Sequence, residues 1–268
     1  MKEIATPSTT KYILEKYHLN ALKKYGQNFL IDVNIINKIV TSAKIDQTTA
    51  VIEVGPGIGA LTQVLGRYSG KVTSFEIDER FMPVYQEFLN QDNIEIIFGD
   101  FMEQDIKPIV DQLKQRYQKV CLVANLPYYI TTEIIEKVVL GNFGIDEMIV
   151  MVQKEVALKM TGIYKNPLLL MIKDMGTIEY LFTVNKNVFM PAPHVDSAIL
   201  KIELKKAPDL KLYEVLNICF KQRRKTILNN LKQSYEEAEE ILLQTGIENQ
   251  KRSEELELAD FKNITKMI

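Results

Sequence analysis

The feature that most constrains the fold is a short apolar run that ends in a glycine-rich turn. Residues 50–54 read Ala-Val-Ile-Glu-Val and lead into Gly-Pro-Gly-Ile-Gly-Ala at 55–60, after which Leu61, Val64 and Leu65 recur at helical spacing. Such a run is typical of a strand buried in a parallel sheet. Glycines let the backbone approach a ligand closely, and the helix start supplies unpaired N–H groups. The sequence therefore predicts an open α/β sheet with a ligand at its strand ends.

The next two strand ends carry acids that suit a nucleoside. The run 71–75 ends in Glu76, about 20 residues beyond the glycines, where a carboxylate can accept both hydroxyls of a ribose. The run 93–98 ends at Gly99-Asp100, and Asp100 is placed to accept a hydrogen bond from an adenine amine. For each acid the alternative is a helix cap or a solvated turn residue. The layout favours a nucleoside-binding protein.

A dinucleotide-dependent oxidoreductase is the alternative class. Gly55, Gly57 and Ala60 also satisfy the glycine fingerprint of nicotinamide and flavin dehydrogenases. Glu53 argues against this class, because a carboxylate inside the strand would lie near the pyrophosphate of a dinucleotide. The same carboxylate suits a cationic sulfonium ligand that carries no phosphate.

The fourth strand end predicts the reaction. The apolar run 119–124 is followed by Asn125-Leu126-Pro127-Tyr128. An Asn oxygen and the backbone carbonyl of Leu126 or Pro127 can accept both N–H bonds of a planar exocyclic amine, while Tyr128 stacks on the ring. This arrangement suits methyl transfer to the amine without a strong base. Considered alone, the tetrapeptide is equally compatible with a strand exit closed by turn chemistry.

Six segments of the chain occur in the order typical of one enzyme family. They are 24–30 (KYGQNFL), 53–62 (EVGPGIGALT), 75–78 (FEID), 125–132 (NLPYYITT), 152–157 (VQKEVA) and 188–197 (VFMPAPHVDS). From about Leu22 to the C-terminus the chain resembles the ribosomal RNA adenine N6,N6-dimethyltransferases, which include the erythromycin-resistance methylases. The resemblance implies S-adenosylmethionine (SAM) as methyl donor and an adenine of ribosomal RNA as acceptor.

One further segment selects a branch of that family. Residues 220–231 (FKQRRKTILNNL) resemble the C-terminal signature of the KsgA branch, whose members dimethylate two adjacent adenosines near the 3′ end of small-subunit (16S) rRNA during ribosome biogenesis. The alternatives are a large-subunit rRNA adenine methylase of the erythromycin-resistance type and another N6-adenine or amide methyltransferase. A non-catalytic ribosome assembly factor is a further alternative.

The resemblance implies roles for individual residues. It places Asn28 and Leu30 over the methionine part of SAM, and Phe189 against the target base opposite Tyr128. From its apolar neighbours alone, Phe189 is more readily a core residue. The predicted SAM-binding residues are Asn28, Leu30, Gly55, Glu76, Asp100 and Asn125, and the predicted catalytic residues are Asn125, Leu126, Pro127, Tyr128 and Phe189.

Charge is segregated along the chain although its net value is only −2. Basic residues crowd 201–232 and glutamates load 236–257. Local charge governs phosphate attraction within a Debye length of roughly 8 Å. With the family resemblance, this predicts that Arg223, Arg224 and Lys225 bind RNA, and the alternative is a solvated helix face. The segment 160–167 is shorter than its counterpart in the family, which leaves its contact with RNA open.

The expected organisation has three parts. Residues 1–25 form an N-terminal arm with a helix from Tyr12 to Leu22, 26–206 form a Rossmann-like SAM-dependent methyltransferase domain, and 207–268 form a small all-α domain that contacts RNA or the ribosome. Strands near 51–54, 72–76, 94–98, 120–124 and 147–152 alternate with helices in an α/β sheet, which the runs 178–184 and 197–204 complete to seven strands.

Several ligands and locations are not expected. The two cysteines lack CxxC spacing and the two histidines have no clustered partners, so we predict no metal site. No apolar run approaches the length of a membrane span and the N-terminus lacks a signal-peptide core, so we expect a cytoplasmic protein without membrane contact. A monomer is the expected state.

Overall fold

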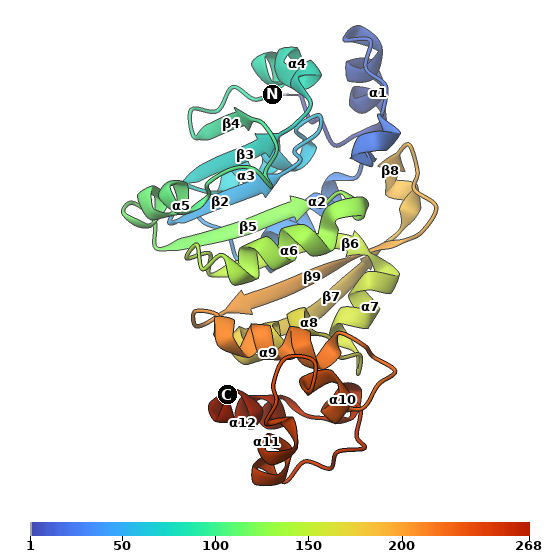
Figure 1. Cartoon of the computed structure of the whole chain (residues 1–268). Coiled ribbons are helices and arrows are strands. Elements are labelled where there is room, and N and C mark those ends of the chain that lie inside the picture. Colours follow the sequence, from blue (N-terminus) through green and yellow to red (C-terminus); the bar gives the residue numbers. More distant parts are fainter. Residues whose placement is uncertain (1) are drawn as a thin grey trace. The chain divides into compact units, whose positions relative to one another are not determined.

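The structure is a computed structural model that describes residues 2–268, without the side chain of Lys23 (Figure 1). The chain divides into two compact units. The larger unit comprises the residues up to Leu158 together with Ile178–Glu203, and the smaller unit comprises Lys159–Thr177 with Leu204–Ile268. We describe each unit by itself.

The larger unit contains, within residues 2–268, a mixed sheet of seven strands in the order β4-β3-β2-β5-β6-β9-β7. Neighbours from β4 to β6 pair in parallel, and β9 runs antiparallel to β6. This confirms the predicted Rossmann-like α/β class. The strands are β2 (Thr49–Val54), β3 (Lys71–Glu76), β4 (Ile94–Phe98), β5 (Lys119–Asn125), β6 (Glu147–Gln153), β7 (Gly176–Val184) and β9 (Ser197–Leu204).

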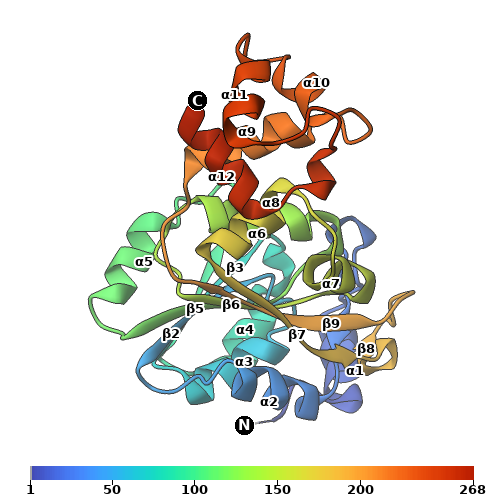
Figure 2. The same ribbon diagram turned by 90° about the horizontal axis from the view of Figure 1, so that it is seen from below.

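Helices cover both faces of this sheet, which explains the near-continuous apolar strands. Every residue of β2 is buried, including Glu53. Figure 2 shows α2 and α3 on one side of the sheet and α5 and α6 on the other. The flanking helices are α2 (Val33–Ser42), α3 (Ala60–Tyr68), α4 (Met82–Phe88), α5 (Lys107–Lys114), α6 (Thr131–Leu140) and α7 (Lys154–Thr161).

The N-terminal segment differs from the expectation of a helix from Tyr12 to Leu22. Helix α1 spans Pro7–Lys16, because the Thr6 side chain caps it by accepting a hydrogen bond from Thr9 N at 3.2 Å. Proline at the first helical position also favours this start. The chain then passes through a short 3-10 turn, η1 (Lys23–Tyr25), to β1 (Phe29–Leu30), which pairs antiparallel with β8 (Phe189–Met190).

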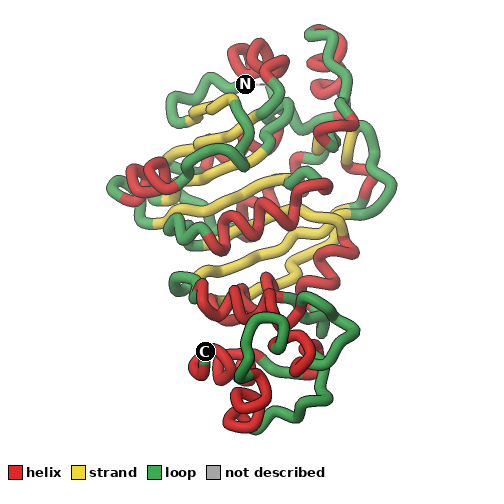
Figure 3. Tube along the Cα trace, in the orientation of Figure 1, coloured by secondary structure: helices red, strands yellow, loops and turns green. Residues whose placement is uncertain are grey.

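The smaller unit is helical, and in Figure 3 the residues after β9 run through helices and loops. Its helices are α8 (Pro167–Met175), α9 (Leu210–Phe220), α10 (Ile227–Leu231), α11 (Ala238–Thr245) and α12 (Leu258–Met267). Phe220 packs against Phe261 with ring centroids 5.6 Å apart. The Asp174 carboxylate on α8 pairs with Lys206 at 2.8 Å and with Lys262. These contacts group α8 with the C-terminal helices in one compact unit, whereas the methyltransferase domain expected from the sequence, 26–206, includes it.

Among the helices of residues 2–268, none combines the length and the apolar character that crossing a membrane requires.

Candidate functional site

A pocket of about 1070 Å³, counted with the space open to solvent, lies in the larger unit where β2, β3, β4 and β5 end. The parallel strands bring their carboxyl ends to one edge of the sheet, so residues from four separate loops meet there. The pocket is lined by residues 25–30, 53–58, 60–61, 75–77, 99–101 and 125–130. Every residue predicted to bind SAM is among them.

The glycine turn after β2 lines the pocket with backbone atoms. Gly55 and Gly57 have φ angles of 69° and 59°, which side chains rarely allow. A Cβ atom at Gly57 would lie 3.3 Å from the Phe29 ring. The turn therefore depends on glycine both for its backbone conformation and for the close packing of the 25–30 segment against it.

Glu76 ends β3 and is 3% exposed. One of its oxygens accepts a hydrogen bond from Asp78 N at 2.9 Å, and the other accepts one from Gly57 N at 3.0 Å. The Tyr85 hydroxyl also lies 3.5 Å from Oε2, but its single proton is donated to Gly57 O at 2.6 Å. Because an ionised carboxylate has about four acceptor positions, each oxygen retains capacity for a further donor, such as a ribose hydroxyl. Burial raises the pKa of this carboxyl to about 7, and the backbone donors oppose that rise.

Glu53, inside β2, is a second buried acid of the pocket. Its Oε2 accepts hydrogen bonds from Thr62 Oγ1 at 2.7 Å and Ser74 Oγ at 2.6 Å. Burial raises the pKa of Glu53 to about 7, and the nearby charge of Glu76 adds to this rise. Two buried acids in one pocket favour a cationic ligand and disfavour phosphates, which agrees with the argument against a dinucleotide.

Asp100, the residue predicted to bind the adenine of SAM, also has a structural role. Asp100 lines the pocket, and its Oδ1 accepts a hydrogen bond from Met102 N at 2.8 Å. This is the turn function that the alternative interpretation gave it. Because Oδ2 can still accept a hydrogen bond from a ligand, the turn orients the carboxylate without excluding a ligand.

Asn125 lies at the end of β5, and its orientation is fixed by the opposite wall. Its Nδ2 donates to the carbonyl of Asn28 at 3.3 Å. Because the amide nitrogen is used in this way, Oδ1 is the group that can accept a hydrogen bond from a ligand. Asn28 itself donates from Nδ2 to Gly26 O at 2.9 Å, so the two asparagines connect β5 to the N-terminal segment.

The two backbone carbonyls proposed as acceptors differ. The oxygen of Pro127 accepts from Thr131 Oγ1 at 2.9 Å and from Ile130 N at 3.3 Å as the chain enters η3 (Tyr128–Ile130). Both of its lone pairs are thus engaged. Leu126 is therefore the better candidate for the carbonyl that accepts a substrate N–H.

Tyr128 has a partner that the sequence did not reveal. Its hydroxyl lies 2.6 Å from Ser197 Oγ, a buried residue at the start of β9. The two residues are 69 positions apart. Ser197 is the last residue of the family-like segment 188–197, and that position was the available signal. The bond fixes the hydroxyl end of a ring that lines the pocket.

Phe189 does not join the pocket. It pairs with Leu30 in the β1–β8 ladder, is 3% exposed and belongs to the hydrophobic core. Among the described residues that line the pocket, Phe189 is absent. A ring that stacks on a base needs an accessible face, so this geometry favours the core alternative over the predicted clamp.

The predicted RNA-binding cations follow α9 in the smaller unit. Arg223, Arg224 and Lys225 are exposed. Arg223 Nη1 donates to the Tyr164 hydroxyl at 2.6 Å, and its guanidinium lies 4.6 Å from the centre of that ring. Glu254 is 3.8 Å away. Arg223 is thus held by neighbouring side chains, one of them from the short segment 160–167.

In the part of the chain that the structure describes, no group of three His, Cys, Asp or Glu side chains is arranged to hold a metal ion.

A mixed sheet in which β4, β3, β2, β5 and β6 are parallel and β9 is antiparallel to β6, with a pocket of glycines and acids at its strand ends, defines the class of Rossmann-like methyltransferases. The chain belongs to the ribosomal RNA adenine dimethylase family, whose model matches residues 18–268. The predicted resemblance is thereby confirmed.

Relatives with closely similar sequences carry the name ribosomal RNA small subunit methyltransferase A. The protein of Oceanobacillus iheyensis is 39% identical over 98% of this chain and 95% of its own length, and that of Bacillus pumilus is 38% identical over 100% and 98%. Two solved structures are also similar. The 23S rRNA methyltransferase ErmE has a TM-score of 0.68 and 26% sequence identity, and the match covers 89% of this chain and 98% of ErmE. A dimethyladenosine transferase of Plasmodium falciparum has a TM-score of 0.70 and 25% sequence identity, and the match covers 88% of this chain and 95% of that protein.

Proposed function

We propose that this chain transfers methyl groups from SAM to the N6 atoms of two adjacent adenosines near the 3′ end of small-subunit (16S) rRNA. The observation that carries the proposal is one pocket that joins two buried acids to the amide of Asn125. The small-subunit enzymes share 38–39% identity with the chain, against 26% for ErmE, which supports the small subunit over the large one as substrate.

The donor half of the pocket consists of Gly55, Glu76 and Asp100 with the wall residues Asn28 and Leu30. Glu76 accepts hydrogen bonds from the ribose hydroxyls, and Asp100 accepts a hydrogen bond from the adenine amine. When bound, SAM supplies a methyl group activated by its sulfonium charge. Glu53 and Glu76 favour that charge electrostatically. This set of residues fits the donor because the acids have acceptor capacity left after their own hydrogen bonds.

The acceptor half consists of Asn125, Leu126 and Tyr128. Asn125 Oδ1 and the carbonyl of Leu126 accept the two N–H bonds of the adenine amine, and the Tyr128 ring stacks on the base. Holding the amine in this way turns its lone pair toward the methyl group, so catalysis is mainly positioning. Each transfer would form an N–CH3 bond as the S–CH3 bond breaks, with S-adenosylhomocysteine as the leaving group, and the acidic N–H proton of the methylated nitrogen would pass to water. After the first transfer the nitrogen keeps one N–H, which a single acceptor can still orient.

RNA is held in addition by the exposed cations after α9. Arg224 and Lys225 neutralise phosphates, and Tyr164 and Glu254 orient Arg223 beside them. Replacing Arg224 and Lys225 by alanine should weaken RNA binding and lower the slope of log K against log salt by about 2. An unchanged slope would assign these cations to an ordinary solvated surface. We further propose that the enzyme acts as a cytoplasmic monomer without a metal.

The decisive experiment uses tritiated SAM with unmethylated small and large ribosomal subunits. We expect label in small subunits alone, on two adjacent adenosines near the 3′ end, as N6,N6-dimethyladenosine. Label in large subunits would establish the alternative of the erythromycin-resistance type. Binding to small subunits without any label would establish a non-catalytic assembly factor.

A further inference from the structure

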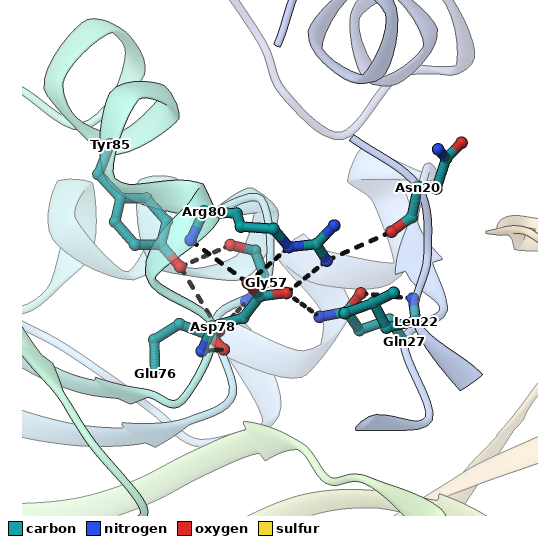
Figure 4. A network of polar contacts seen from close by, with 8 residues as sticks. All are labelled: Asn20, Leu22, Gln27, Gly57, Glu76, Asp78, Arg80 and Tyr85. Carbon is teal, nitrogen blue, oxygen red and sulfur yellow. Dashed lines mark hydrogen bonds and ion pairs between the residues drawn. The ribbon is translucent and has the colours of Figure 1, made fainter. Parts of the chain in front are cut away.

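A hydrogen-bond network outside the predicted ligand set reaches the pocket from the N-terminal segment (Figure 4). Its centre is Asp78, which follows β3 and is 5% exposed. The carboxylate accepts from Arg80 Nε at 2.8 Å and Nη2 at 2.6 Å, and from Gln27 Nε2 at 2.9 Å. The backbone N–H of Arg80 donates to the same carboxylate at 3.3 Å. Four hydrogen bonds on one buried carboxylate fix its position and that of the side chains around it.

The same network extends to the backbone of the segment before β1. Gln27 Oε1 accepts a hydrogen bond from Leu22 N at 2.8 Å, and Arg80 Nη2 reaches the carbonyl of Asn20 at 3.4 Å. Asp78 therefore holds two backbone points of residues 20–22 through two different side chains.

At its other end the network meets the donor half of the pocket. The backbone N–H of Asp78 donates to Glu76 Oε1, and the second oxygen of Glu76 accepts from Gly57 N. Tyr85 adds a hydrogen bond from its hydroxyl to Gly57 O at 2.6 Å. A continuous series of hydrogen bonds thus runs from Leu22 to the glycine turn.

We propose that Asp78, Gln27 and Arg80 form a latch that positions residues 25–30 as the wall of the donor pocket. All six of these residues line the pocket. The β1–β8 ladder, the hydrogen bond from Asn125 to Asn28 O and the packing of Phe29 on Phe81 attach the segment from residue 28 onward, and the latch attaches it at Gln27 and at residues 20–22. Asp78 is a positioning residue, because it acts on the donor through the wall. The inference rests on the proposed function, in which Asn28 and Leu30 cover the methionine part of SAM.

A purely structural role makes a different prediction. Asp78 also caps the 3-10 turn η2 (Glu79–Phe81), so its removal could loosen the loop and weaken every ligand equally. The latch instead affects the amino-acid part of the donor and spares the nucleoside. The Asp78 backbone N–H that supports Glu76 is retained when the side chain is truncated, which keeps the ribose site intact.

The test compares S-adenosylhomocysteine with 5′-methylthioadenosine, which lacks the amino-acid part. Calorimetry on the full chain should show that Asp78→Ala and Gln27→Ala each weaken the binding of S-adenosylhomocysteine by about tenfold. The double variant should bind no more weakly than either single variant, because the two residues act as one unit. Binding of methylthioadenosine should stay within about twofold. Gln27→Glu, which opposes Asp78 with a second carboxylate while keeping the side-chain size, should reproduce the loss in a folded protein.

The matched control is Glu87→Gln. Glu87 pairs with Lys16 and ties α1 to α4, so its loss disturbs the N-terminal segment away from the pocket. It should leave both affinities unchanged. Equal losses for the two ligands, or a double variant about a hundredfold weaker than the wild type, would refute the latch. A wild-type chain that binds neither ligand would refute the donor assignment itself.

Discussion

The two halves of the pocket are built differently. On the proposed donor side, Glu53 and Glu76 are at most 3% exposed. Glu53 accepts hydrogen bonds from the hydroxyls of Thr62 and Ser74, and Glu76 accepts them from the backbone N–H groups of Gly57 and Asp78. On the acceptor side, Asn125 is partly exposed and is oriented by one hydrogen bond of 3.3 Å. The proposed donor side is therefore organised before any ligand binds, whereas on the proposed acceptor side the substrate would supply the remaining hydrogen bonds.

This difference has a physical reason. A small donor that is used in every turnover gains affinity from a rigid site, because little conformational entropy is lost on binding. A base that must leave an RNA strand and enter the pocket needs an accessible face and room to rotate. Substitutions on the two sides should accordingly separate binding from chemistry.

The largest effect is expected from Asn125→Ala. Removing the oriented amide oxygen should lower the methylation rate by about a hundredfold, as for the loss of one preorganised hydrogen-bonding group at a transition state. Donor affinity should be largely unchanged, because Glu76 and Asp100, the proposed acceptors for the ribose and the adenine, are retained. Initial rates with tritiated SAM and unmethylated small subunits measure the first quantity, and calorimetry measures the second. An unchanged rate would remove Asn125 from the mechanism.

Glu76→Ala should have the opposite signature. Loss of the charge-assisted hydrogen bonds to the ribose should weaken S-adenosylhomocysteine by about thirtyfold. The affinity for methylthioadenosine should fall by a similar factor, because both ligands carry the ribose. This equal loss distinguishes Glu76 from the latch residue Asp78, whose loss should spare methylthioadenosine. Calorimetry with both ligands tests the point. Undiminished affinity would exclude the ribose role.

The pH dependence of donor binding sharpens the same contrast. Burial raises the pKa of Glu76 to about 7, so the carboxyl is mostly protonated at pH 6 and mostly ionised at pH 8. Because the ionised form is the better acceptor, affinity for S-adenosylhomocysteine should rise by about tenfold between these values. Glu76→Gln, which cannot ionise, should show a flatter profile. Affinity that falls with rising pH would contradict the proposed role of the carboxylate.

Features carried by local pattern were predictable from the sequence. The apolar runs located the strands to within two residues, and the rule that parallel strands end at one edge brought Glu76, Asp100 and Asn125 into one pocket. The bounds expected for the first helix, Tyr12–Leu22, were wrong, because Thr6 and Pro7 set the start of the helix earlier in the chain, at Pro7–Lys16.

Features that depend on distant partners were not predictable. Gln27 meets Asp78 across 51 positions, and Tyr128 meets Ser197 across 69. From the sequence alone, Gln27 and Tyr128 could each bond to many polar side chains, and only the fold selects the partner. Phe189 illustrates the same limit, because its apolar neighbours fit a core residue and its motif fits a clamp, and strand pairing favours the core.

The smallest effect is expected from Tyr128→Phe. The ring that stacks on the base is retained, and the loss is one neutral hydrogen bond to Ser197, which should lower the methylation rate by about threefold. Ser197→Ala should have the same effect, and the double variant should be no slower, because both changes remove one interaction. Initial rates on small subunits measure this. If Tyr128→Phe slowed transfer as much as Asn125→Ala, the hydroxyl would belong to the chemistry, and the acceptor side would be as tightly organised as the donor side.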